Sequence, residues 1–94
     1  MSESLPHPDW LRAFSAFAET GNFTRAAERL SLTQPAVFGQ VKKLSAWAGV
    51  PLYRREGRAL VLTAEGRLMR AFAAELLSYC DHFRALLQLS LIHI

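Results

Sequence analysis

Apolar residues recur every three or four positions along the first half of this chain, which predicts three short helices. The first is expected to start at Pro8 or Asp9 and to stop at Gly21, a residue that suits a left-handed C-terminal cap. The second is expected to begin near Thr24, whose hydroxyl can cap it, and to end at Leu30. A tight turn separates it from the third helix, so this segment has the form of a helix-turn-helix.

The third helix is expected from about Gln34 to Ala48. Thr33 before it is a good N-terminal cap, Pro35 in its first turn costs no intrahelical hydrogen bond, and Gly49 ends it. Its apolar positions at spacings of four, three and four face the core: Val37, Val41, Leu44 and Ala48. A second stripe faces outward: Gln34, Phe38, Lys42 and Ser45, with Pro35 and Gly39 alongside. A helix-turn-helix places such an exposed stripe against the major groove of DNA.

Beyond residue 50 the pattern changes from helical spacing to short extended runs. Residues 52–55 and 59–62 are expected to form two short strands around the connection Glu56-Gly57-Arg58, which gives a hairpin, or wing. A glycine within a three-residue connection supports this prediction.

Thr63 can cap a last helix that is expected from Ala64 to about Leu89. Six large apolar residues recur along it at alternating spacings of three and four, in a seam typical of helix pairing: Met69, Phe72, Leu76, Tyr79, Phe83 and Leu86. A domain of this size has too small a core to cover so long a stripe, and exposed apolar stripes mark interfaces. We therefore expect a homodimer through this helix, with packing of the helix against its own domain as the alternative.

These elements predict a mainly α fold, a winged helix-turn-helix of three helices plus a short two-stranded wing, followed by a long linker or dimerisation helix. The expected division is a DNA-binding domain over residues 1–63, the linker helix over residues 64–89 and a tail over residues 90–94. We assign the tail no function and interpret it as a remnant of truncation or cloning, because it has no polar face and interrupts the seam at Ser90.

Positive charge is concentrated on the segment that carries the helix-turn-helix. The whole chain has a formal net charge of +3, but residues 23–67 hold eight Lys and Arg residues against three carboxylates, a net charge of +5. Such a segment favours a polyanionic partner. The first residues include acidic groups and no apolar run, which excludes a signal peptide, and no stretch reaches the roughly 20 apolar residues of a membrane span. We therefore expect a cytoplasmic protein.

The residues that enzymes and metal sites need are scattered. The histidines, His7, His82 and His93, lie far apart in the sequence, and no nucleophile or carboxylate pair has catalytic spacing. The single cysteine, Cys80, excludes an internal disulfide and a cysteine-built metal site, and we expect it to be a packed thiol in an apolar stripe. The sequence thus predicts no catalytic residue, no metal and no cofactor.

Recognition of DNA needs phosphate contacts and base contacts, and the sequence offers both. The candidate phosphate contacts are cations and hydroxyls near helix starts and on the wing: Thr24, Arg25, Thr33, Lys42, Arg55 and Arg58. For base reading, Gln34 can hydrogen-bond adenine through both amide atoms. Pro35, Ala36 and Phe38 can meet thymine methyl groups, and Gly39 lies on the same stripe.

Several of these residues also have ordinary structural explanations. Arg25 and Arg29 can be solvated helix charges that pair with acidic neighbours. Phe38 can be an outlying part of the core, in which case Gln34 is left to read bases alone. Arg54 and Arg55 alternate along one strand, so only one of them can face DNA.

In order and spacing, these motifs resemble the N-terminal DNA-binding domain of LysR-type transcriptional regulators of bacteria. The matching motifs run from Trp10 to Gly66: Leu11-x-x-Phe14, Gly21-Asn22-Phe23-Thr24-x-Ala26-Ala27-x-x-Leu30, Thr33-Gln34-Pro35-Ala36-Val37, Val41-x-x-Leu44, Gly49-x-Pro51-Leu52-Tyr53-x-Arg55 and Leu62-Thr63-x-x-Gly66. The resemblance implies a winged helix-turn-helix whose linker helix pairs two DNA-binding domains. It also implies a separate effector domain, so we expect any small-molecule effector to act only through a domain absent from this chain.

This sequence departs from the family pattern at three outward positions, Phe38, Gly39 and Ser45, where Ser, a polar or basic residue, and Glu are usual. These departures concern the base preference and leave the fold unchanged. The resemblance favours Arg55 over Arg54 as the wing contact. It also suggests a short interrupted inverted repeat, with T at one end and A at the other, as the binding site.

We therefore expect sequence-specific binding of double-stranded DNA, with the helix over residues 34–48 in the major groove and the wing on the backbone. The alternative from another class is a winged-helix module that assembles with other proteins without binding DNA. A third hypothesis is an inert truncation product whose exposed seam drives aggregation. The charge of the central segment and the Thr-Gln-Pro start of the third helix favour DNA.

Overall fold

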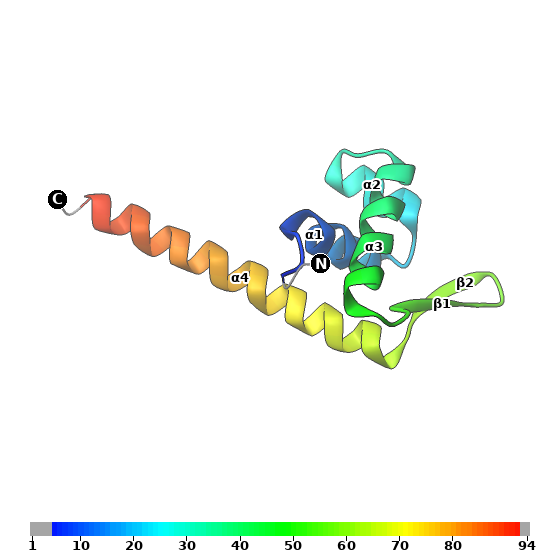
Figure 1. Cartoon of the computed structure of the whole chain (residues 1–94). Helices are drawn as coiled ribbons and strands as arrows, with labels where there is room; N and C mark the ends of the chain where they lie inside the picture. The colour runs from blue at the N-terminus through cyan, green and yellow to red at the C-terminus, as the bar shows by residue number, and fades with distance from the viewer. Residues whose placement is uncertain (1–4, 93–94) are drawn as a thin grey trace.

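The structure is a computed structural model that describes residues 5–92. Its elements follow one another as α1 (Pro8–Thr20), α2 (Phe23–Leu30), α3 (Gln34–Ala48), β1 (Tyr53–Glu56), β2 (Ala59–Leu62) and α4 (Ala64–Ile92). The first three helices pack together as one unit, from which the hairpin of β1 and β2 and the far end of α4 extend in opposite directions (Figure 1). The predicted fold class is confirmed.

Local backbone chemistry explains where two of the helices end. Gly21 and Gly49 end α1 and α3 in the left-handed region, with φ angles of 68° and 76°, and each donates its N–H to the carbonyl four residues earlier. Thr33 caps the start of α3, because its Oγ1 accepts the N–H of Ala36 at 3.2 Å. These predicted ends are confirmed.

The start of α2 differs from the prediction. The helix begins at Phe23, and its cap is Asn22, whose Oδ1 accepts the N–H of Arg25 at 3.0 Å. A capping residue keeps an extended backbone, which Asn22 has at φ −153° and ψ 123°, whereas Thr24 already lies inside the first turn. The predicted capping role of Thr24 is therefore wrong, and its hydroxyl is available for another partner.

The hydrophobic core lies where α1 meets α2, α3 and α4. Its largest fully buried side chains come from α1, α3 and the residue before β1: Phe14, Phe17, Leu11, Leu44, Leu52, Val37 and Val41. The apolar stripe predicted for α3 is confirmed, since Val37, Val41 and Leu44 are each 0% exposed. Because this stripe is turned inward, the opposite stripe of α3 faces solvent.

The wing is an antiparallel hairpin in which Tyr53 pairs with Leu62 and Glu56 pairs with Ala59. Its loop is two residues long, Gly57 and Arg58, and not the predicted three-residue connection, because Glu56 continues the ladder. Gly57 adopts a φ of 62°, as the first position of a type II′ turn requires. A turn of this type matches the twist of the two strands and so holds the short wing in register.

α4 packs against the rest of the domain only along its first half. Thr63 caps it as predicted, because its Oγ1 accepts the N–H of Gly66 at 3.0 Å. Of the predicted seam, Met69 and Leu76 pack against the core. The remaining four residues are exposed: Phe72 by 42%, Tyr79 by 71%, Phe83 by 54% and Leu86 by 58%. Packing against its own domain therefore accounts for the first part of the helix alone.

The second half of α4 extends beyond the three-helix unit (Figure 1). The helix continues to Ile92, past the predicted end at Leu89, and the last two residues of the predicted tail lie outside the described residues. Cys80 is exposed, so the prediction of a packed thiol is wrong, because the described part of the chain does not cover its side chain. The division of the chain at residues 63 and 89 stays a prediction.

Candidate nucleic-acid interface

The turn between α2 and α3 brings the starts of these helices together. Ser31 ends α2 in the left-handed region at a φ of 56°, so the chain reverses before Thr33 begins the next cap. At the surface, Thr24 Oγ1 of α2 then donates to Gln34 Oε1 of α3 at 3.5 Å. Two predicted DNA contacts from different helices thus lie side by side.

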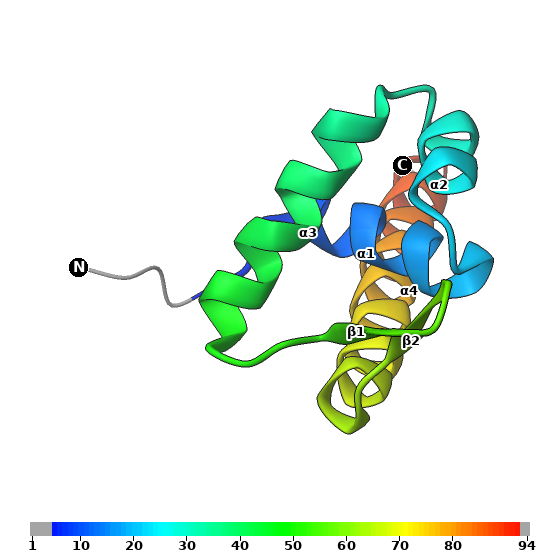
Figure 2. The same ribbon diagram turned by 90° about the vertical axis from the view of Figure 1, so that its right-hand side faces the viewer.

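An open groove of about 660 Å³ lies between these helix starts and the wing. Five of the predicted DNA contacts line it: Thr24, Gln34, Phe38, Arg55 and Arg58. Figure 2 shows α2, α3 and the wing from this side of the molecule. The helix-turn-helix and the wing therefore form one continuous surface, as a joint contact with one duplex requires.

Strand alternation separates the two neighbouring arginines of the wing. Arg54 and Glu56 lie on one face of β1 and form an ion pair of 2.8 Å, whereas Tyr53 and Arg55 lie on the other face and line the groove. Burial raises the pKa of the Tyr53 hydroxyl, and the positive charge of Arg55 partly opposes this rise. The preference for Arg55 as the wing contact thus has a geometric basis, since Arg54 already has an acidic partner.

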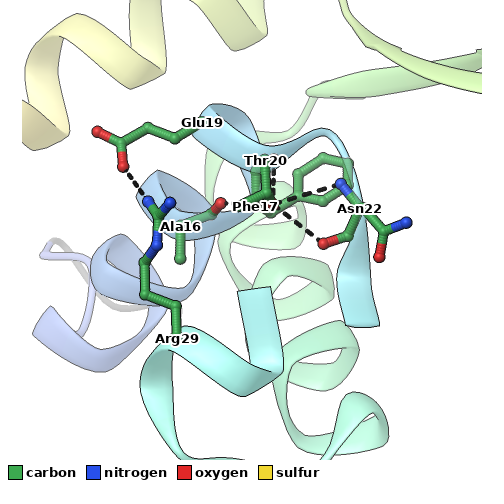
Figure 3. A network of polar contacts seen from close by, with 6 residues as sticks. All are labelled: Ala16, Phe17, Glu19, Thr20, Asn22 and Arg29. Atoms are coloured by element: carbon green, nitrogen blue, oxygen red, sulfur yellow. Dashed lines mark hydrogen bonds and ion pairs between the residues drawn. The ribbon is translucent and has the colours of Figure 1, made fainter. Parts of the chain in front are cut away.

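A polar network fixes the corner between α1 and α2 (Figure 3). Arg29 of α2 forms an ion pair with Glu19 near the end of α1. Thr20 Oγ1 lies 2.8 Å from the carbonyl oxygen of Ala16 and 3.0 Å from that of Asn22. The interpretation of Arg29 as a paired structural charge is confirmed. Arg25 has no ion pair within the described residues, so its charge remains available to an anion.

Phe38 is anchored on the core and also presented to solvent. Its ring meets that of Phe23 edge to face, with the ring centroids 5.5 Å apart and the planes at 74°. Phe23 is stacked on the buried ring of Phe17 at 4.2 Å. Phe38 nevertheless keeps 45% of its surface exposed. It is therefore the outermost ring of an aromatic cluster. Its inner side belongs to the edge of the core, and its outer side is free to meet a base.

The other predicted DNA contacts lie outside the groove. All are exposed except Ala36 and Gly39, which are partly buried: Arg25, Thr33, Pro35, Ala36, Gly39 and Lys42. The groove is also lined by residues that the sequence pattern did not predict as DNA contacts: Gly21, Asn22, Phe23, Tyr53, Ala59 and Leu60. The alternation of Tyr53 with Arg55 is a signal that could have identified Tyr53.

Between residues 5 and 92 the structure brings together no group of three His, Cys, Asp or Glu side chains that could hold a metal ion. Within the same residues, no helix has the length and apolar character needed to cross a membrane.

The comparisons with known proteins agree with this geometry. A family model described as "Bacterial regulatory helix-turn-helix protein, lysR family" matches residues 8–67, from α1 to the first turn of α4. The chain belongs to the LysR family. The glycine cleavage system transcriptional activator of Escherichia coli K12 is 49% identical over 67 residues, which are 71% of this chain and 22% of that relative. The transcriptional activator CmpR of Synechocystis is 44% identical over 71 residues, 76% of this chain and 23% of the relative.

Solved structures of LysR-family DNA-binding domains share the fold over nearly the whole chain. The DNA-binding domain of CbnR in complex with DNA has a TM-score of 0.83 at 32% identity, covering 89% of this chain and 97% of that one. The DNA-binding domain of BenM bound to catB site 1 DNA has a TM-score of 0.82 at 32% identity, covering 87% of this chain and 92% of that one. The chain spans less than a quarter of the curated relatives named above.

Proposed function

We propose that this chain binds double-stranded DNA at a specific sequence, as the DNA-binding part of a LysR-type transcriptional regulator. The observation that carries the proposal is the groove that joins α2, α3 and the wing, because it holds base-reading and phosphate-binding groups on one exposed surface. The likeness to domains solved as DNA complexes supports it. The function is one of binding, without a catalytic step, and acting on chromosomal DNA places it in the bacterial cytoplasm.

In this proposal the first turns of α3 enter the major groove of the duplex. Gln34 hydrogen-bonds an adenine edge through its amide, which the contact with the Thr24 hydroxyl holds in one orientation. Thr33 and Pro35 lie at the positive end of the helix dipole, where backbone phosphate is bound favourably. Phe38, one turn further along, meets the apolar part of a base edge.

The phosphate contacts surround this reading edge. Four cations without an ion pair in the described part of the chain are assigned to them: Arg25, Lys42, Arg55 and Arg58. Arg25 approaches the backbone on the side of α2, and Arg55 and Arg58 approach it from the wing, so the strand contacts flank α3. Contacts of this kind fix the register of the protein on the duplex without reading its sequence.

A homodimer through α4 completes the proposal. Four residues on this helix keep 42–71% of their surface exposed and together offer an apolar surface to a partner: Phe72, Tyr79, Phe83 and Leu86. Met69 and Leu76 hold the first half of the helix to its own domain and so fix the direction in which the surface points. Because a two-fold dimer presents two reading edges, its site is an inverted repeat with half-sites one helical turn, or a multiple of it, apart.

The test compares the duplex affinity of the wild type with that of variants at the neighbouring wing residues Arg54 and Arg55. A bound sequence is first selected from a random duplex pool, and its affinity is measured by fluorescence anisotropy at several salt concentrations. Arg55→Ala is expected to weaken binding to all duplexes alike and to reduce the log–log salt slope by about 0.9 for each bound protomer, because each protomer loses one phosphate contact. Arg54→Ala is the matched control and is expected to keep the wild-type slope.

The outcome separates the two classes of function. Absence of duplex binding even at low salt would favour the protein-assembly module that was the alternative. Equal effects of Arg54→Ala and Arg55→Ala would leave DNA binding in place but refute the assignment of the groove-facing side of the wing.

A further inference from the structure

We propose that Phe38 reads the C5-methyl group of a pyrimidine in the major groove, so that one position of each half-site requires a C5-methylated base. Thymine and 5-methylcytosine both carry this group. The inference rests on the proposed function and adds to it the chemical group that this particular chain selects.

The position of Phe38 gives the first argument. It lies one helical turn after Gln34 on the outward stripe of α3, and both side chains line the groove between α3 and the wing. A phenyl ring offers a base edge no hydrogen bond, and 45% of its surface faces solvent in the free chain. Among the groups that base pairs present in the major groove, the C5-methyl of pyrimidines is the one that favours an apolar partner.

The packing beneath Phe38 gives the second argument. The ring rests edge to face on Phe23, which is 9% exposed and is itself stacked on the buried Phe17. A ring supported in this way loses little conformational entropy when it meets a ligand, so an apolar contact contributes most of its free energy to binding.

Gly39 gives the third argument. It follows Phe38 in α3, and apart from its chain neighbours and the backbone of α3, no atom lies within 4 Å of a Cβ built at this position. No other part of the described protein therefore fills the space over Gly39, which leaves a base edge room to approach α3 there. Glycine weakens the interior of a helix relative to alanine, so its presence here is consistent with a need for space.

The experiment scans methyl groups across the selected duplex. Each thymine is replaced in turn by deoxyuridine, which removes only the C5-methyl group, and the affinity of the full chain is measured. At one thymine of each half-site the loss is expected to be about four-fold, the contribution of one buried methyl group. At that position, a 5-methylcytosine–guanine pair is expected to bind more tightly than a cytosine–guanine pair by a similar factor.

The residue is assigned with variants on the same duplexes. Phe38→Ala is expected to bind the thymine and deoxyuridine duplexes equally, whereas the control Lys42→Ala weakens both and keeps their ratio. If Phe38→Ala does not fold, 5-iododeoxyuridine at the sensitive position supplies a second measurement with the unmodified chain. Iodine occupies the place of the methyl group, and irradiation is expected to crosslink it to Phe38, which mass spectrometry identifies.

The possible failures are distinct. A duplex bound with Arg55-dependent affinity but without a deoxyuridine-sensitive position overturns the reading of methyl groups and leaves the proposed function intact. A sensitive position whose thymine-to-deoxyuridine ratio is unchanged in Phe38→Ala, or whose crosslink falls on another residue, also overturns it. Failure to bind any duplex overturns the proposed function itself.

Discussion

Gly66 and Gly39 allow the same substitution to be tested at two helical sites with opposite surroundings. A Cβ added at Gly66 would lie 1.9 Å from the carbonyl oxygen of Leu52 and 2.9 Å from its carbonyl carbon. At Gly39, apart from the chain neighbours and the backbone of α3, an added Cβ meets no atom within 4 Å. Alanine at Gly66 must therefore displace backbone, while alanine at Gly39 enters open space.

The magnitudes follow from the contacts around Leu52. Its carbonyl oxygen accepts the N–H of Thr63 at 3.1 Å, and its side chain is 1% exposed, so movement away from α4 disturbs both a hydrogen bond and the core. Overpacking costs about 1–3 kcal/mol and the hydrogen bond about 1 kcal/mol, offset by up to about 1 kcal/mol of helix propensity. We expect Gly66→Ala to lower the free energy of unfolding by about 1–3 kcal/mol. Gly39→Ala is expected to raise it by about 1 kcal/mol.

Urea unfolding followed by far-ultraviolet circular dichroism measures both effects. Protein concentration must be the same for all variants, because association stabilises the folded chain by mass action. A change of 1 kcal/mol shifts the Tm of a domain of this size by about 4–8 °C, so the two variants should separate clearly in thermal melts. If Gly66→Ala is as stable as the wild type, the close approach of α4 to Leu52 is wrong. If Gly39→Ala destabilises the chain, the open space beside α3 is wrong.

Three further substitutions test other parts of the molecule. Gln34→Ala should reduce the preference for the selected duplex over random DNA in anisotropy titrations, because a base contact is lost. An equal loss of affinity for the selected duplex and for random DNA would contradict the role of Gln34 in reading bases. Phe83→Glu should give monomers in sedimentation velocity, because a charge then enters the apolar seam, and persistent dimers would refute the seam. Asn22→Ala should lower the free energy of unfolding by about 1 kcal/mol through loss of the α2 cap, whereas Thr24→Ala should change it by less than about 0.5 kcal/mol; the reverse order in urea unfolding would restore Thr24 as the cap.

The parts of the fold that depend on local chemistry were predictable from the sequence. The stripe of Val37, Val41 and Leu44 has helical spacing and is buried as a unit, and Gly21 and Gly49 adopt the left-handed conformation that ends a helix. Both features depend on residues that are close together in the sequence, so the sequence alone is enough to predict them.

The wrong predictions concern features that depend on a choice between two suitable capping residues or on contacts between residues far apart in the sequence. Asn22 and Thr24 are both good caps, and the choice between them is made by where the backbone leaves α1, in a corner that Thr20 and the Glu19–Arg29 ion pair stabilise. The seam of α4 is regular in sequence, yet tertiary packing divides it, because the three-helix unit covers only the first half of the helix.

The sequence predicted a DNA-binding surface on α3, but it predicted only part of the spatial arrangement of the residues around that surface. The outward stripe of α3 follows from the inward one, so Gln34 and Phe38 could be assigned from the sequence. That Arg55 and Arg58 share a groove with them depends on how the wing is placed relative to the starts of α2 and α3, which no local sequence pattern determines. All of the predicted DNA contacts stay predictions, those that line the groove as well as those on surfaces outside it.

The ion pair between Arg54 and Glu56 has a consequence for how the domain approaches a duplex. It makes the wing a two-sided ribbon, electrically neutral on one side and cationic on the other, where Arg55 and Arg58 face the groove. A polyanion attracts such a ribbon in a single orientation, because a half-turn of the molecule would present the neutral side. In the proposed complex, the domain is thus already the right way round before α3 meets its first base pair.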